Sequence, residues 1–169
     1  AAARALGELA RERWKAAGGG EIKRPSPGED VWPRDLKPDF RNVDVGIART
    51  RGAFSDEDEV RENEALFVDL IASARRFVYS ENQYFASRVV AEAIAKRLAE
   101  PDGPEFVLIQ PKSADGWLSE EVMGSARAEL MAALDRHDKF SRFRVYTPVD
   151  DAREDIYVHA KVTIVDDRV

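Results

Sequence analysis

The residue types best suited to chemistry gather in one short segment of the sequence, Tyr157–Asp166. Apolar and polar residues alternate there, which predicts a β-strand over 157–165. Successive side chains of a strand point to opposite faces, so His159, Lys161 and Thr163 share one face. An imidazole beside an ammonium can bind a phosphoryl oxygen and then attack phosphorus or transfer a proton. The same spacing also fits an ordinary half-buried strand whose polar face meets solvent, and for an isolated H-x-K that alternative is the commoner one.

The sequence contains its own comparison, because its other histidine also has a lysine two positions later. His137 lies with Lys139 at the polar end of a predicted helix, where side chains two positions apart diverge. The seventh residue after His137 is Arg144, whereas the seventh residue after His159 is Asp166. We therefore interpret His137 as a surface residue.

Strand and helix patterns alternate along the chain before this segment. Strands are predicted at 43–47, 77–79, 106–109 and 143–146, and helices at 55–74, 87–99 and 119–137. The first helix is predicted to begin at Ser55, because Asp58 three residues later completes a capping box. The strand at 106–109 is apolar throughout, as in strands buried on both faces. This order predicts an α/β fold whose mixed sheet is flanked by helices on both faces.

The N-terminal quarter of the chain differs in character. Residues 1–17 predict a helix that ends at three consecutive glycines. Residues 18–42 hold four of the eight prolines and predict an extended linker. Residues 43–169 form the α/β domain. The chain lacks an initiator methionine and stops directly after its last apolar run, so we expect a fragment of a longer protein.

Composition excludes several classes of function. The 169 residues include 26 basic and 32 acidic side chains, for a net charge of −6, which argues against bulk binding of nucleic acid. Cysteine is absent, which excludes disulfides, thiol nucleophiles and cysteine-bound zinc. No apolar run reaches the roughly 18 residues of a membrane span, and no signal-peptide pattern opens the chain. We expect the protein in the cytoplasm or at a membrane surface.

The pattern H-x-K-x-x-x-x-D, formed by His159, Lys161 and Asp166, resembles the HKD signature of the phospholipase D superfamily. Four more stretches resemble bacterial phospholipase D in the same order, namely Ile47–Arg51, Tyr79–Phe85, Pro111–Leu118 and Val165–Arg168. The N-terminal helix resembles the stretch that follows the first HKD motif of those enzymes. The resemblance covers nearly the whole chain. It implies the C-terminal half of an α/β/α enzyme, with the second of two motifs.

The resemblance implies a phosphodiesterase that acts on glycerophospholipids at a membrane surface through a phosphohistidine, without a metal or other cofactor. One histidine attacks phosphorus while a second protonates the leaving alcohol. We assign His159 as general acid and base, with nucleophile as the alternative, and Lys161 as a phosphate ligand. Asp166 either orders the groups around the site or is purely structural. The partner is the missing half with the first motif, or a second subunit.

Other candidates for substrate binding follow predicted strands. Glu81, Asn82 and Gln83 come directly after one strand and Lys112 after the next, which is where open α/β sheets place ligand groups. Arg49 could face an anionic head group. The alternatives are a capped strand end for the first three and solvated surface for the two cations, while Tyr84 and Phe85 are predicted to pack.

Three alternatives to a phospholipase stay open. The first two are a nuclease and a phosphatidyl-transferring enzyme like cardiolipin synthase, both from the same superfamily. The third is a folded half-domain without turnover of its own, because only one complete motif is present and the Gly-Ser-x-Asn segment of the family does not follow Asp166 within this sequence.

Overall fold

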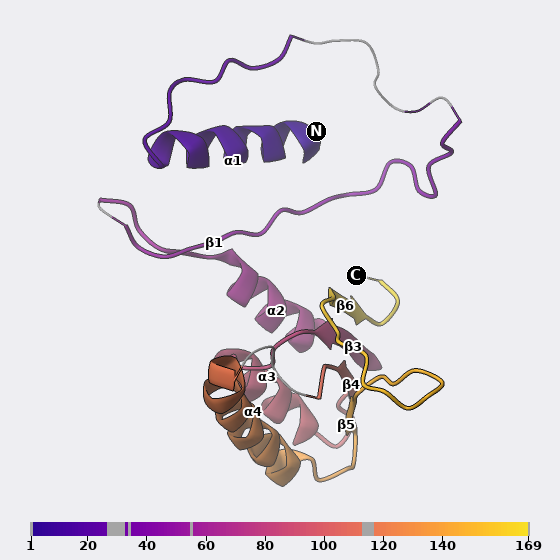
Figure 1. Ribbon diagram of the computed structural model, residues 1–169. Coiled ribbons are helices and arrows are strands. Elements are labelled where there is room, and N and C mark those ends of the chain that lie inside the picture. Colours follow the sequence, from indigo (N-terminus) through magenta and orange to yellow (C-terminus); the bar gives the residue numbers. More distant parts are fainter. Residues whose placement is uncertain (1, 27–32, 34, 55, 113–116, 169) are drawn as a thin grey trace. The chain divides into compact units, whose positions relative to one another are not determined.

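We describe the protein from a computed structural model, which covers residues 2–26, 33, 35–54, 56–112 and 117–168 (Figure 1). The chain divides into two compact units, residues 1–48 and residues 49–169. The first unit contains the helix α1 (Ala2–Ala16), which ends at the glycine run as predicted. Gly18 has a φ of 83°, a backbone conformation that glycine adopts without strain. The Trp14 indole closes this end by donating a hydrogen bond of 3.0 Å to the Gly20 carbonyl.

The second unit is built on a four-stranded mixed sheet with the strand order β5-β4-β3-β6. Strand β3 (Phe77–Asn82) pairs in parallel with β4 (Glu105–Ile109), and β4 pairs in parallel with β5 (Phe143–Tyr146). Strand β6 (Lys161–Val165) runs antiparallel beside β3. The end of β3 and the beginning of β6 therefore meet at the same edge of the sheet.

Three helices connect the strands of this unit, α2 (Glu62–Ser73), α3 (Arg88–Leu98) and α4 (Trp117–His137). Their buried side chains and one face of the sheet form a single hydrophobic core. In the sheet, Val78 pairs with Phe106 of β4 and with Val165 of β6, and all three are buried. Leu98 of α3 and Leu134 of α4 have no exposed surface. The predicted α/β fold with a mixed sheet is confirmed.

The opposite face of the sheet is more open. Register places Tyr79 beside Ile164 and Glu81 beside Val162 on this face. Val162 and Ile164 are 45% and 38% exposed, although they are the apolar residues of the alternating segment. The buried side chains of the described helices of this unit all join the core on the other face. The prediction that helices flank both faces of the sheet is therefore wrong for the described part of this unit, because both parallel connections and α2 pack on one side.

Two local predictions are wrong in the region before β3. Residues 43–47 form no strand, and Val43 and Val45 are 60% and 62% exposed. The helix begins at Glu62 rather than at Ser55, which lies outside the described residues. Instead, β1 (Thr50–Arg51) and β2 (Val60–Arg61) form a short antiparallel pair. Backbone pairing with the preceding segment replaces the first turns of the predicted helix.

Ser87 provides a local test of how the sequence sets a helix boundary. Its side chain accepts a hydrogen bond of 3.3 Å from the Val90 amide at the start of α3. We expect Ser87→Ala to lower the free energy of unfolding by about 1 kcal/mol, because this amide loses its acceptor. Ser87→Thr keeps the hydroxyl and should retain most of the stability. Urea unfolding followed by circular dichroism measures both, and equal losses would contradict the capping role.

Candidate functional site

The meeting edge of β3 and β6 places the motif residues next to the predicted substrate-binding residues. Asn82, the last residue of β3, pairs with Lys161, the first residue of β6. Two residues along the same face, Ser80 pairs with Thr163, and their hydroxyls share a hydrogen bond of 3.0 Å. The prediction that Lys161 and Thr163 share a face is therefore confirmed. The strand prediction is wrong at its start, because His159 lies in the extended segment before β6.

Lys161 is held at this edge by two acceptors. Its ammonium donates to the Gln83 side-chain oxygen at 3.3 Å and to the His159 backbone carbonyl at 3.1 Å. The second contact is with the His159 backbone and folds the lysine back along its own segment. Both side chains are exposed, and an anion from solvent can reach them.

Two tyrosines complete this cluster. The Gln83 side-chain amide donates to the hydroxyls of Tyr157 at 2.7 Å and of Tyr84 at 3.0 Å. The Tyr157 ring stacks near the His159 imidazole, with 6.4 Å between ring centroids. Gln83 thus connects two segments of the chain, 83–84 and 157–161. Its side-chain oxygen accepts from Lys161, and its nitrogen donates to both tyrosines. We name the five residues His159, Lys161, Gln83, Tyr84 and Tyr157 the edge cluster.

The three consecutive candidates after Ser80 do not point in one direction. Asn82 lies on the Lys161 face, and its side-chain oxygen accepts a hydrogen bond of 3.1 Å from the Tyr84 amide. Glu81 lies on the opposite face, where its carboxylate accepts a hydrogen bond of 2.6 Å from the Tyr79 hydroxyl. This hydrogen bond raises the pKa of Tyr79. The structure therefore places Asn82 and Gln83 with the motif residues, but not Glu81. Strand β3 extends to Asn82, so its alternation puts Glu81 on the other face, while Gln83 follows the strand and contacts Lys161.

Asp166 binds the backbone rather than the edge cluster. Its carboxylate accepts three hydrogen bonds from consecutive amides, Arg75 at 2.7 Å, Arg76 at 2.8 Å and Phe77 at 2.9 Å. The bond from Phe77, followed by those from Arg75 and Arg76, lowers the pKa of Asp166. These amides form the turn that leads from α2 into β3. The sequence left open whether Asp166 orders the site or is purely structural. The geometry supports the structural role, because the carboxylate fixes the end of β6 to the start of β3.

The two remaining cationic candidates form ion pairs away from Lys161. Arg49 donates to both carboxylate oxygens of Glu62, at 2.6 Å and 2.9 Å, and this pairing lowers the pKa of Glu62. Lys112 forms an ion pair of 3.2 Å with Asp155, which lies two residues before Tyr157 in the chain. Both cations are thus paired with carboxylates outside the edge cluster.

Sequence reasoning missed both tyrosines of the cluster. Tyr84 is 38% exposed instead of packed, while Phe85 is buried as predicted. Tyr157 was read only as part of the motif strand. Its position two residues before His159 was the available signal, because residues two apart in an extended segment lie on the same side. His137 is exposed at the end of α4 and its ring contacts the Ala133 carbonyl at 2.8 Å, as expected of a surface residue.

Among the described residues, no three histidine or acidic side chains are grouped as a metal site would require. Within that same part of the chain, none of the helices has the length and apolar content to cross a bilayer.

No protein-family model matches the sequence, and no curated protein matches it.

Proposed function

We propose that this chain supplies one half of a phospholipase D-type phosphodiesterase centre. The observation that carries the proposal is the exposed pair of His159 and Lys161 in one cluster at the edge of the sheet, with the lysine positioned by Gln83. The order of the motif stretches in the sequence supports the same family. The substrate class is a phosphodiester of a glycerophospholipid, and the reaction is hydrolysis or transfer of the phosphatidyl group.

Each group of the pair has a defined task in this proposal. The Lys161 ammonium neutralises a non-bridging oxygen as negative charge develops on the phosphoryl group. The histidine of the first motif, which lies in the missing half or a second subunit, attacks phosphorus, and the bond to the head-group alcohol breaks as the new nitrogen–phosphorus bond forms. His159 gives a proton to the departing alcohol and later takes one from the water or alcohol that cleaves the phosphohistidine. The reverse assignment, with His159 as nucleophile, uses the same geometry.

The proposal requires both motifs, and this sequence contains only one of them, so the chain alone and its parent protein should behave differently. By parent protein we mean a protein that contains this chain together with a second H-x-K-x-x-x-x-D motif. We expect the parent protein to release head groups from vesicles of phosphatidylcholine and phosphatidylglycerol, and the chain alone to give no measurable release. Plasmid DNA is the control substrate for both.

The outcomes of this assay separate the alternatives. Cleavage of DNA without release of lipid head groups would indicate the nuclease. Exchange of the head group for an added alcohol, with little hydrolysis, would indicate a phosphatidyltransferase. Turnover by the chain alone that depends on His159 would contradict the requirement for two motifs.

A further inference from the structure

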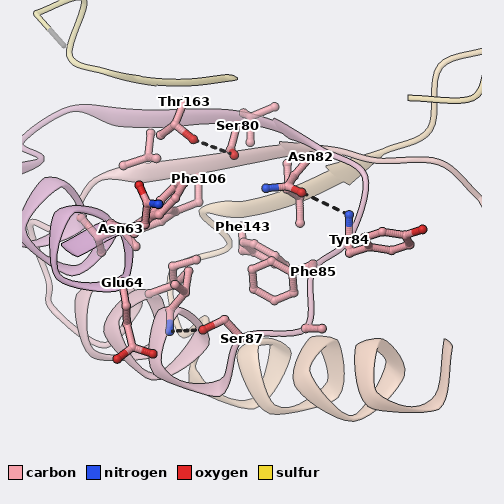
Figure 2. Close-up of a pocket in the computed structure, with 18 residues that line it drawn as sticks. Asn63, Glu64, Ser80, Asn82, Tyr84, Phe85, Ser87, Phe106, Phe143 and Thr163 are labelled. Atoms are coloured by element: carbon pink, nitrogen blue, oxygen red, sulfur yellow. Dashed lines mark hydrogen bonds between the residues drawn. The ribbon is translucent and has the colours of Figure 1, made fainter. Parts of the chain in front are cut away.

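A cavity of about 240 Å³ lies between the core face of the sheet and the helices α2 and α3 (Figure 2). Most of its wall is apolar, and the apolar lining includes Phe67, Ile71, Phe85, Ile94, Phe106 and Phe143. Polar side chains line it where the sheet approaches the edge cluster. These are Ser80, Asn82 and Thr163.

The polar groups of the wall are engaged with the protein itself. Ser80 and Thr163 share their hydrogen bond, and the Asn82 oxygen accepts from the Tyr84 amide, as Figure 2 shows. Ser87 caps α3 with its hydroxyl, Asn63 donates a hydrogen bond of 3.0 Å to the Thr50 hydroxyl, and Glu64 forms an ion pair of 3.4 Å with Arg61. A buried water needs about three polar partners, and an apolar cavity whose polar groups are already bonded favours an apolar occupant.

The volume limits the size of that occupant. An apolar cavity of about 150 Å³ holds benzene, so this cavity admits a somewhat larger group. Pockets for complete drug-sized ligands begin at about 300 Å³. A single alkyl chain of modest length therefore fits, whereas a lipid with two long chains does not.

The cavity and the phosphate ligand lie on the same face of β6. Thr163 lines the cavity, and Lys161 is two residues away on that strand, a distance of about 7 Å between Cα atoms. Asn82, the partner of Lys161 in the sheet, also lines the cavity. A phosphate at Lys161 and an alkyl chain in the cavity can thus belong to one molecule.

We propose that the cavity binds one alkyl chain of an amphiphilic phosphate ester whose phosphate is held at Lys161. This inference rests on the proposed function, because it uses the same phosphate site and adds the apolar arm of the substrate. It predicts that alkyl phosphates bind this chain more tightly than inorganic phosphate.

Three probes test the two parts of the site separately, namely inorganic phosphate, 1-hexanol and monohexyl phosphate. Calorimetric titration of the full chain should give hexyl phosphate an affinity at least about tenfold above that of inorganic phosphate, since several methylene groups leave water. Hexanol should bind and be displaced by hexyl phosphate. Lys161→Ala should weaken both phosphates and leave hexanol unchanged.

Neighbouring valines of α3 provide matched variants. Val90 lines the cavity and packs against the core, whereas Val89 is 39% exposed and does not line it. V90F fills the cavity and should weaken hexyl phosphate and hexanol at least about tenfold, while V89F should change neither. Phe67→Trp fills the same space from α2. It provides a second test of the cavity if V90F does not fold.

The outcomes distinguish this inference from the proposed function. Equal affinities for inorganic and hexyl phosphate, without binding of hexanol, would overturn the alkyl site even if phosphate binding depends on Lys161. If hexanol binds while Lys161→Ala leaves the affinity for phosphate unchanged, that result would overturn the combined alkyl and phosphate site, and with it the phosphate site of the proposed function. If neither V90F nor Phe67→Trp changes the affinity for hexyl phosphate, its alkyl chain binds outside the cavity. That result would also overturn the inference.

Discussion

Replacing His159 with alanine in the parent protein is expected to reduce phospholipid turnover by at least about 100-fold, the lower end of what a general acid contributes. The variant loses the group that gives a proton to the departing alcohol, or the nucleophile itself under the reverse assignment. The fold should survive, because the His159 side chain is exposed and its ring contact is with Tyr157 at the surface. Release of head groups from vesicles measures kcat, and thermal unfolding measures the fold.

The chain offers a matched control for this substitution. His137 is also followed by a lysine two residues later and is also exposed, but it lies at the end of α4, outside the edge cluster. His137→Ala should leave turnover within about twofold of the original, since an exposed histidine outside the site contributes little. Equal loss in both variants, or near-normal turnover in His159→Ala, would refute the assignment of His159.

Sequence patterns located most of the elements of the second unit. The apolar run at 106–109 became β4, and the strand predicted at 143–146 became β5 with the same bounds. The helix predicted at 87–99 is α3, with Ser87 as its cap and Ile94 and Leu98 in the core. These segments combine a local signal with burial, so local pattern and tertiary packing favour the same structure.

Prediction failed where a pattern had no tertiary support. The alternation at 43–47 is as regular as that of a strand, but a strand also needs a neighbour to accept its backbone hydrogen bonds, and none pairs with it among the described residues. The capping box at Ser55 and Asp58 was outweighed by pairing of Thr50 with Arg61. The Arg49–Glu62 ion pair lies beside this pairing and connects residues 13 positions apart.

The candidate site shows the same division. The sequence identified Lys161, Asn82 and Gln83 as separate candidates, and the antiparallel pairing of β3 with β6 brings them together. The hydrogen bond from Gln83 to Tyr157 joins residues 74 positions apart, and no local pattern encodes it. Glu81 was misplaced because the predicted strand ended at Tyr79, whereas three more residues of β3 fix the face of each side chain.

Asp166→Ala is expected to lower the melting temperature of the second unit by on the order of 10 °C, because three backbone amides lose their acceptor at once. Asp167→Ala is the matched control. Both residues have a positive φ, 54° and 57°, so alanine meets similar backbone strain at each position. The Asp167 carboxylate forms only a surface ion pair of 3.1 Å with Arg76, and its loss should cost much less.

The pH dependence of stability tests the Asp166 carboxylate independently of how far Asp166→Ala lowers the melting temperature. The three amides lower the pKa of Asp166 below its ordinary value of about 3.8. A carboxyl group with a lowered folded-state pKa stabilises the fold at pH values above the ordinary one, and this contribution is lost as the pH falls through the folded-state value. Melting temperatures measured from pH 6 down to pH 2.5 should therefore fall more steeply below about pH 4 for the original protein than for Asp166→Ala. Parallel curves would show that the carboxylate does not fasten β6 to the start of β3, and the position of Lys161 beside Asn82 would then need another cause.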